Sequence, residues 1–329
     1  MPPLRWGVIG TGIGRSFVRA VAQQTRQRVV AVTARNQEKT RAFAAELEIA
    51  TVHESVEALV NDPGCDAVYI ATPHPLHKDQ ALAAIAAGKH VLVEKPIAMS
   101  AAEAIEITAA GRAAGVLVME AMWTRYLPQA DVIRRVIADG IIGDVHRVQA
   151  DFGFVSTYDR GSRLWAPELG GGALLDAGIY PISFASSILG PPTRIEVAGD
   201  VGPAGVDARV DLMIATSRGR GLLSTSITTQ LPTIATVSGS AGGIAIAAPF
   251  FAASAVRVTR GAAWDGAIGV FSTPKLAHDD GGIGLQATAF ACYVAEGRLE
   301  SPLHPHDEVV NVMHVIDVAR SAVFEAHSE

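Results

Sequence analysis

Short apolar runs alternate with longer amphipathic stretches through the first third of the chain. The runs are rich in valine, isoleucine and leucine, which is typical of strands that are buried on both faces of a sheet. We predict strands at residues 4–10, 29–34, 67–71, 90–93 and 116–119, and helices at residues 16–24, 38–47, 78–87 and 101–114. This alternation predicts an α/β fold, a doubly wound parallel sheet with helices on both faces.

The pattern changes near residue 122. Strand-like runs then follow one another with short connections of glycine, serine and proline, which favours an antiparallel sheet. We predict helices at residues 127–139, 283–296 and 307–325, and strands at residues 145–155, 195–201, 209–216, 222–229, 234–239 and 255–259. The sequence therefore predicts two domains, residues 1–121 and 122–329, of which the second is an α+β domain with a large open antiparallel sheet.

A glycine-rich loop follows the first predicted strand and consists of Gly10, Thr11, Gly12, Ile13 and Gly14. The first glycine permits a tight turn and the second lets a pyrophosphate approach the backbone, while the next helix directs its N-terminus at that pyrophosphate. The usual fingerprint has its third glycine one position later, where this chain has Arg15. A tight turn in any α/β protein gives a similar loop, but its place after the first strand favours a dinucleotide cofactor.

The end of the second predicted strand bears on the choice of cofactor. An NAD site usually has an acidic residue there, about 20 residues beyond the glycines, that binds the ribose 2′-hydroxyl. This chain has Arg35 instead, with Lys39 one helical turn later. Both are ordinary solvated charges in the plainer interpretation, but a guanidinium and an ammonium suit a 2′-phosphate. The sequence thus favours NADP, with NAD as the alternative.

Composition excludes several classes of function. The chain of 329 residues is 49% hydrophobic, with a net charge of −6 and no block of lysine or arginine, which argues against nucleic acid as a partner. No apolar run has the length of a membrane span, and the first residues lack the apolar segment of a signal peptide, so we expect a cytoplasmic protein. Cys65 and Cys292 are too few for a disulfide framework or a zinc site, and we expect no metal.

Two places carry side chains that could act on a substrate beside a dinucleotide. Lys95 follows a buried strand and precedes Pro96, which restricts its backbone at the carboxyl end of the predicted sheet. Further along, three consecutive glycines at 170–172 precede Asp176 and Tyr180, which share one face if the segment is helical. The glycines would let a backbone approach a ligand closely, and a carboxylate beside a phenol can relay a proton.

The order of these segments resembles that in the glucose-fructose oxidoreductase/inositol dehydrogenase (Gfo/Idh/MocA) family. After the glycine loop come Ala-Thr-Pro-His-Pro-Leu-His at 71–77, Gly-Lys-His-Val-Leu-Val-Glu-Lys-Pro at 88–96, and the glycine–aspartate–tyrosine segment at 170–180. Residues 120–128 look most like the branch that contains dimeric dihydrodiol dehydrogenase and NADP-dependent sugar dehydrogenases. The resemblance covers nearly the whole chain. It implies a Rossmann domain that binds NAD(P), followed by a sheet that pairs subunits into homodimers or homotetramers.

By this resemblance, Lys95 and Asp176 match a catalytic lysine and an aspartate, and Tyr180 matches a position that is tyrosine in this branch and histidine in many relatives. The chain departs from the family pattern at Arg15 and at Gly14, where many relatives have alanine. We expect further cofactor contacts at Thr72, Pro73, His74, His77, Glu94, Lys95, Arg163 and Trp165. Trp123 and Arg125 are candidate substrate contacts, with core packing as the alternative for the indole, and His304 and His306 are expected at a helix start.

The resulting hypothesis is an oxidoreductase that transfers hydride between NADP and the CH–OH group of a small sugar, polyol or diol. Tyr180, assisted by the Lys95 cation, would take the hydroxyl proton, and Asp176 would hold a substrate hydroxyl or set the charge on Lys95. The alternatives are a cofactor-sensing regulator of the same fold and an enzyme that shuttles hydride between two sugars on a tightly held NADP.

Overall fold

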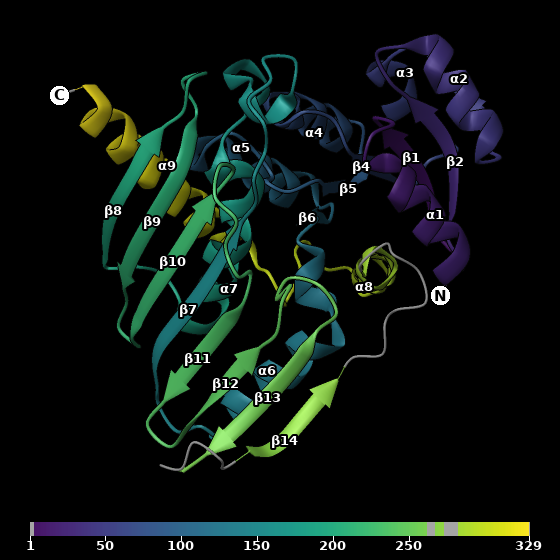
Figure 1. Cartoon of the computed structure of the whole chain (residues 1–329). Coiled ribbons are helices and arrows are strands. Elements are labelled where there is room, and N and C mark those ends of the chain that lie inside the picture. The colour runs from purple at the N-terminus through teal and green to yellow at the C-terminus, as the bar shows by residue number, and fades with distance from the viewer. Residues whose placement is uncertain (1–2, 262–266, 273–281, 329) are drawn as a thin grey trace. The chain divides into compact units, whose positions relative to one another are not determined.

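The computed structural model describes residues 3–261, 267–272 and 282–328. The chain divides into two units, which are described separately below (Figure 1). Unit 1 comprises Met1–Tyr126 and His278–Val309, and unit 2 comprises Leu127–Ala277 and Val310–Glu329. The last helix, α9 (His306–Ser328), runs from one unit into the other.

The sheet of unit 1 has six parallel strands in the order β3-β2-β1-β4-β5-β6. Its strands are β1 (Arg5–Ile9), β2 (Arg28–Thr33), β3 (Thr51–Val52), β4 (Ala67–Ile70), β5 (His90–Val93) and β6 (Val118–Glu120). The direction of winding reverses between β1 and β4, and ligands of such sheets bind at this point, outside the carboxyl ends of the strands. The predicted doubly wound parallel sheet is confirmed.

Helices connect these strands, and several begin at side-chain caps. They are α1 (Gly14–Gln24), α2 (Gln37–Glu46), α3 (Val56–Val60), α4 (His77–Ala86) and α5 (Ala101–Ala114), with short 3₁₀ turns η1 (His74–Leu76) and η2 (Trp123–Tyr126). Asn36, Ser55 and Ser100 each accept a hydrogen bond from a backbone N–H in the first turn of α2, α3 and α5. Gly115 ends α5 with a φ of 68°, which glycine adopts without strain.

Helix α8 (Ile283–Ala295) completes the core of unit 1, although the sequence placed it in the second domain. Phe290 of α8 packs 4.8 Å from Trp6 of β1, centroid to centroid, and Phe17 of α1 packs edge-on against the same indole at 5.1 Å. Gln27 joins the two parts, because it accepts from Trp6 Nε1 at 2.6 Å and donates to the Ala287 carbonyl at 2.9 Å. The predicted boundary near residue 122 therefore omits a segment that returns to unit 1 from the far end of the chain.

The sheet of unit 2 has eight described strands in the order β14-β13-β12-β11-β7-β10-β9-β8 (Figure 1). They are β7 (Val145–Gly153), β8 (Arg194–Val201), β9 (Asp207–Ala215), β10 (Arg220–Ser226), β11 (Ala235–Gly239), β12 (Gly242–Ile246), β13 (Ala255–Arg260) and β14 (Ala267–Ser272). Neighbours are antiparallel except β7 and β10, which are parallel. The predicted large antiparallel sheet is confirmed, with β12 and β14 as strands that the sequence pattern did not reveal.

Two helices of unit 2 follow β6 and precede β8, namely α6 (Pro128–Ala138) and α7 (Ile179–Leu189). The helical stretch Pro167–Leu189 is the one stretch among the described residues that is long and apolar enough to cross a membrane by length and composition. However, 78% of its most apolar part is buried inside the protein, and α7 packs on β7 and β10. Burial in a core gives this apolar composition a structural reason.

Candidate active site

The glycine loop of unit 1 lies where β1 ends beside β2 and β4. Gly10 has a φ of 105°, and a side chain there would collide with the Ala71 carbonyl, so the position requires glycine. Its N–H donates to the Thr33 carbonyl at 2.9 Å. A Cβ added at Gly12 would meet no described atom within 4 Å. The backbone at Gly12 is therefore open to close approach by a ligand.

Helix α1 begins at Gly14 directly after this loop. Its N-cap, Ile13, supplies no side-chain hydrogen bond, and the first turn carries no acidic residue. The first N–H groups of a helix lack partners within the helix and favour an anion. A Cβ at Gly14 would lie 3.2 Å from Val8 Cγ1, so the third glycine lets the helix pack closely on β1. Together, loop and helix end fit the pyrophosphate of a dinucleotide.

Arg15, at the position where the fingerprint has glycine, is directed to α2. Its guanidinium pairs with Glu46 and lies over the Phe43 ring, 5.2 Å from the centroid. Arg19 joins the same carboxylate at 3.2 Å. The departure from the usual fingerprint is thus accommodated by an ion pair between α1 and α2.

Two exposed cations follow β2. Arg35 and Lys39 are both exposed, and neither forms a hydrogen bond through its side chain or an ion pair with any residue that the structure describes. Between them, Asn36 caps α2 by accepting from the Lys39 N–H at 2.9 Å. Two exposed cations near a helix N-terminus suit a phosphate group.

Thr72 and Pro73 follow β4, His74 begins η1, and His77 begins α4. His77 is fully buried, with Nε2 2.9 Å from the Thr72 carbonyl and Nδ1 2.8 Å from the Pro96 carbonyl. Burial lowers the pKa of His77, although both carbonyls oppose that shift. The imidazole thus links the loop after β4 to the loop after β5. His74 is also buried, 5.6 Å from His77 between ring centroids. No cluster able to hold a metal ion occurs among the described residues.

Lys95 lies in the turn after β5, and its peptide bond to Pro96 is cis. Glu94 accepts from the Tyr69 hydroxyl and, at 3.1 Å, from the backbone N–H of Lys95. Burial raises the pKa of Glu94. The Ile97 N–H donates to Glu120 Oε1 at 2.8 Å. Side chains therefore hold the backbone on each side of Lys95.

The two predicted substrate contacts of unit 1 lie in η2. Trp123 is half-buried. Arg125 is only 6% exposed, and its Nη2 lies 2.5 Å from Glu308 Oε1. The structure thus gives this guanidinium a buried ion pair inside unit 1. Sequence reasoning missed Glu308 and Glu120. An acidic residue at the end of a helix or strand does not indicate which distant side chain it will contact.

The triple glycine of unit 2 serves contacts within the protein. A Cβ at Gly171 would lie 2.7 Å from the Leu164 carbonyl oxygen, and a side chain at Gly172 would collide with the Asp207 carboxylate. Gly172 also has a φ of 122°. The close approach that the sequence assigned to a ligand is therefore made by the protein's own backbone and by Asp207.

Asp207 begins β9 and is 1% exposed. Its Oδ2 accepts the Leu174 N–H at 2.6 Å, at the start of a short π-helical turn, Leu174–Gly178. Burial raises the pKa of Asp207 to about 6, although the hydrogen bond from the Leu174 N–H opposes that shift. Single π turns inside helices are frequent at functional sites, and this one carries Asp176.

Asp176 lies on this turn and Tyr180 lies at the start of α7. The segment is therefore helical, as predicted. Arg163 Nη2 donates to Asp176 Oδ1 at 2.5 Å, and the Asp176 side chain is 17% exposed. The second amino group of Arg163, Nη1, is buried and has no hydrogen-bond partner among the residues that the structure describes. Arg163 was predicted to contact the cofactor, and the structure shows that it holds the candidate carboxylate.

Tyr180 lies among aromatic side chains. Its ring is 5.0 Å from that of Phe251 and 5.7 Å from that of Phe152, centroid to centroid, and both phenylalanines are half-buried. Trp165, predicted as a cofactor contact, is 2% exposed and packs in a small core with Ala173, Val206, Ala208 and Ile227. Its Nε1 donates to the Thr157 carbonyl at 3.1 Å. The structure therefore gives the Trp165 indole a place in this small core.

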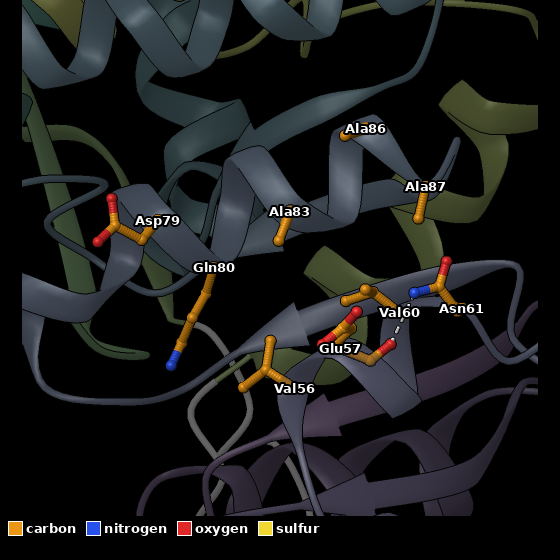
Figure 2. Close-up of a pocket in the computed structure, with 9 residues that line it drawn as sticks. All are labelled: Val56, Glu57, Val60, Asn61, Asp79, Gln80, Ala83, Ala86 and Ala87. Atoms are coloured by element: carbon orange, nitrogen blue, oxygen red, sulfur yellow. Dashed lines mark hydrogen bonds between the residues drawn. The ribbon is translucent and has the colours of Figure 1, made fainter.

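A groove of about 520 Å³ lies between α3 and α4 (Figure 2). Apolar and polar side chains line it, namely Val56, Glu57, Val60, Asn61, Asp79, Gln80, Ala83, Ala86 and Ala87. Figure 2 shows Gln80 extending from α4, and its Oε1 accepts from the Thr72 hydroxyl at 2.7 Å. None of the predicted site residues lines this groove.

Comparisons with known proteins agree with this architecture in both units. Residues 4–122 match an oxidoreductase family with an NAD-binding Rossmann fold, and residues 131–245 match the GFO/IDH/MocA C-terminal domain. Trans-1,2-dihydrobenzene-1,2-diol dehydrogenase of Homo sapiens is 34% identical over 332 residues, which covers 97% of each chain. The protein of that name from Mus musculus is 38% identical over 245 residues, or 73% of each chain.

Solved structures are similar over nearly the whole chain. KijD10, a 3-ketoreductase from Actinomadura kijaniata in complex with NADP and TDP-benzene, has a TM-score of 0.83 and 26% identity, and covers 97% of this chain and 98% of its own. Levoglucosan dehydrogenase in complex with NADH and levoglucosan has a TM-score of 0.89 at 20% identity, with 98% of each chain covered, which is a likeness of fold. Because family models match both parts and relatives at 34% identity cover 97% of it, this chain belongs to the GFO/IDH/MocA family of oxidoreductases.

Proposed function

We propose that this oxidoreductase is an NADP-dependent dehydrogenase that acts on a CH–OH group of a diol, sugar or polyol, or on the matching carbonyl. The observation that carries the proposal is the anion cradle of unit 1. It combines a glycine loop that is open at Gly12, a helix N-terminus without a side-chain cap, and the cations Arg35 and Lys39, which have no side-chain partner among the described residues. KijD10 is described with NADP and levoglucosan dehydrogenase with NADH, so the preference for NADP rests on the two cations of this chain.

These residues fit the cofactor in distinct ways. The backbone at Gly12 and the N-terminus of α1 would hold the pyrophosphate, and Arg35 with Lys39 would hold the 2′-phosphate. When bound, the nicotinamide supplies the hydride acceptor or donor. The protein contributes position and proton handling.

In the proposed mechanism, Tyr180 is the general acid–base and Lys95 is the cation that orients the reacting hydroxyl. Tyr180, in its phenolate form, accepts the proton of the substrate hydroxyl as the substrate carbon is oxidised. Asp176, held by Arg163, accepts a hydrogen bond from a substrate hydroxyl. In the reverse direction Tyr180 donates the proton to the carbonyl oxygen.

Within the substrate classes, the surroundings of Tyr180 favour a diol on a partly apolar ring. Phe152 and Phe251 flank the phenol at 5.7 and 5.0 Å, and such rings bind an apolar or planar ligand face. The relatives named trans-1,2-dihydrobenzene-1,2-diol dehydrogenase agree with this choice. We further propose that unit 2 pairs subunits through its sheet into a homodimer or homotetramer.

A substrate panel tests the proposal. The purified protein is incubated with NADP or NAD and with trans-dihydrodiols, aldoses, anhydro-sugars or inositols, and NADPH or NADH formation is followed by absorbance. We expect turnover with at least one CH–OH substrate, faster with NADP. Tyr180→Phe should lower turnover by ~10²–10⁴-fold, the range for a general acid–base, with cofactor affinity unchanged.

Tyr158→Phe is the matched control, because this tyrosine of unit 2 is 43% exposed and packs on Trp165. It should leave turnover within about two-fold. Cofactor binding without turnover on any substrate would instead indicate a cofactor-sensing regulator. NADP that remains bound through dialysis and passes hydride between two sugars would indicate the sugar–sugar oxidoreductase.

A further inference from the structure

Glu120 lies at the end of β6 and is 1% exposed. Its two carboxylate oxygens have separate partners, both inside unit 1. Oε1 accepts the Ile97 N–H at 2.8 Å, and Oε2 lies 2.8 Å from His304 Nε2. Ile97 is two residues beyond Lys95, so the carboxylate holds the backbone of the turn that carries the candidate catalytic lysine.

The contact with His304 extends into a chain of ionisable side chains. His304 Nδ1 lies 3.8 Å from Glu308 Oε2, and Glu308 Oε1 lies 2.5 Å from Arg125 Nη2. The Glu308 side chain is 18% exposed and the others are nearly fully buried. The order from Arg125 to Glu120 is therefore guanidinium, carboxylate, imidazole, carboxylate.

The surroundings shift the pKa of two members of this chain, His304 and Glu308. Burial and Arg125 lower the pKa of His304, but the carboxylates of Glu120 and Glu308 outweigh them and raise it overall. Burial raises the pKa of Glu308, but Arg125 and His304 prevail and lower it to about 2. Removal of one partner of a buried ion pair is costly, because it leaves the other charge without compensation.

We propose that Glu120 is a positioning residue for Lys95: its carboxylate, locked by His304, fixes the backbone at Ile97 and thereby the place of the lysine. This inference rests on the catalytic role proposed for Lys95. A displacement of about 1 Å at a reacting group can lower turnover by about 10²-fold. The position of Lys95 thus depends on a segment, His304–Glu308, that lies about 200 residues away in sequence.

Two substitutions of Glu120 distinguish the effect of its side-chain length from the effect of its charge. Glu120→Gln keeps an oxygen at the same reach from the Ile97 N–H and removes the charge, and Glu120→Asp keeps the charge and shortens the side chain by one methylene. If Glu120 positions the turn through its hydrogen bond, Glu120→Asp should lower kcat by ~10–100-fold with KM for NADP within about three-fold. Glu120→Gln should keep kcat within about five-fold of the wild type, as rescue by the conservative variant.

A second readout does not depend on catalysis. The chain has five lysines, so ¹³C-methyl groups attached to them by reductive methylation give an NMR spectrum in which Lys95 is assigned by its loss in Lys95→Arg. Glu120→Asp should move the Lys95 resonance and Glu120→Gln should leave it in place. In a Lys95→Ala background, Glu120→Asp should cause no further loss of residual activity, because its effect acts through the lysine.

Glu300→Asp is the matched control. Glu300 accepts the His306 N–H at 2.7 Å in the same returning segment, and it makes no contact with residues 94–97 in the part of the chain that the structure describes. It should change neither kcat nor the Lys95 resonance.

The inference is overturned if Glu120→Asp leaves kcat and the Lys95 resonance unchanged, or if Glu120→Gln is impaired as severely as Glu120→Asp. If Glu120→Asp does not fold, Glu120→Met, which keeps the length of the side chain and removes the acceptor of the Ile97 N–H, takes its place: a shifted Lys95 resonance supports the inference and an unmoved one rejects it. A wild type without turnover on any substrate contradicts the proposed function, whereas the resonance comparison still decides whether Glu120 positions Lys95.

Discussion

Asp207 occupies the space that a side chain at Gly172 would need, and it holds the Leu174 N–H at 2.6 Å. At the scale of single residues, the sequence predicted which side chains carry the proposed chemistry, namely Lys95, Asp176 and Tyr180. It did not identify the groups that hold them. Asp207 lies in an alternating strand pattern and resembles any other polar strand residue until the fold brings it to the glycines.

The raised pKa of Asp207 makes a prediction about stability. Because burial raises this pKa from 3.8 to about 6, the unfolded chain releases the proton first, so the group's contribution is complete below pH ~3.8 and is lost as pH rises through ~6. A shift of about two units corresponds to ~3 kcal/mol in the free energy of unfolding. Asp207→Asn keeps an acceptor for Leu174 and removes this titration.

Urea unfolding of the wild type and of Asp207→Asn at pH values from 4 to 7 provides the measurement. Other carboxylates, such as Glu308, change stability in the opposite direction, but they are common to both proteins. The difference between the two curves should therefore rise with pH in favour of the variant. Parallel curves would show that Asp207 titrates as in the unfolded chain.

At the scale of secondary-structure elements, the parallel strands place the residues proposed for cofactor binding at their carboxyl ends. The glycine loop after β1 and the cations after β2 are neighbours because β1 and β2 pair in register, with Ile9 opposite Thr33. The sequence predicted both strands and both loops, since buried runs and glycine spacing are local patterns. The direction of Arg15, which turns to Glu46 on α2, required knowledge of how two helices pack.

Arg35 and Lys39 should determine which cofactor binds. Replacement of both by alanine should weaken NADP binding by ~10–100-fold for each lost charge-assisted contact and leave NAD binding nearly unchanged. Fluorescence titration with each cofactor measures this. Arg19→Ala is the control, because Arg19 is exposed like them but pairs with Glu46. Equal weakening of both cofactors would argue against a 2′-phosphate site.

At the scale of the whole molecule, unit 1 combines the N-terminal part of the sequence with a segment near the C-terminus. Phe290 of α8 is fully buried against Trp6, and the segment beyond it carries His304 and Glu308 into the charged chain that ends at Glu120. The sequence predicted α8 as a helix, but an apolar helix face does not indicate whether it packs in the core of unit 1 or of unit 2.

Phe290→Ala should therefore destabilise the protein through unit 1, by ~3–5 kcal/mol for loss of a buried phenylalanine. Val270→Ala, on β14 with 65% of the side chain exposed, should change stability by less than about 0.5 kcal/mol. Chemical unfolding of the two variants, followed by tryptophan fluorescence, compares them. A small effect of Phe290→Ala would mean that α8 is peripheral to the core of unit 1.

The sequence by itself determined the parallel sheet and the antiparallel character of the second sheet, and it predicted the loops and residue types of the proposed dinucleotide-dependent reaction. These follow from periodicity, glycine spacing and strand ends, which act over a few residues. Only the tertiary structure decided that β7 pairs in parallel with β10, that α8 belongs to unit 1, and that Glu120 meets His304. Such contacts depend on side-chain complementarity between segments that are distant in sequence, and local patterns carry no record of their partners.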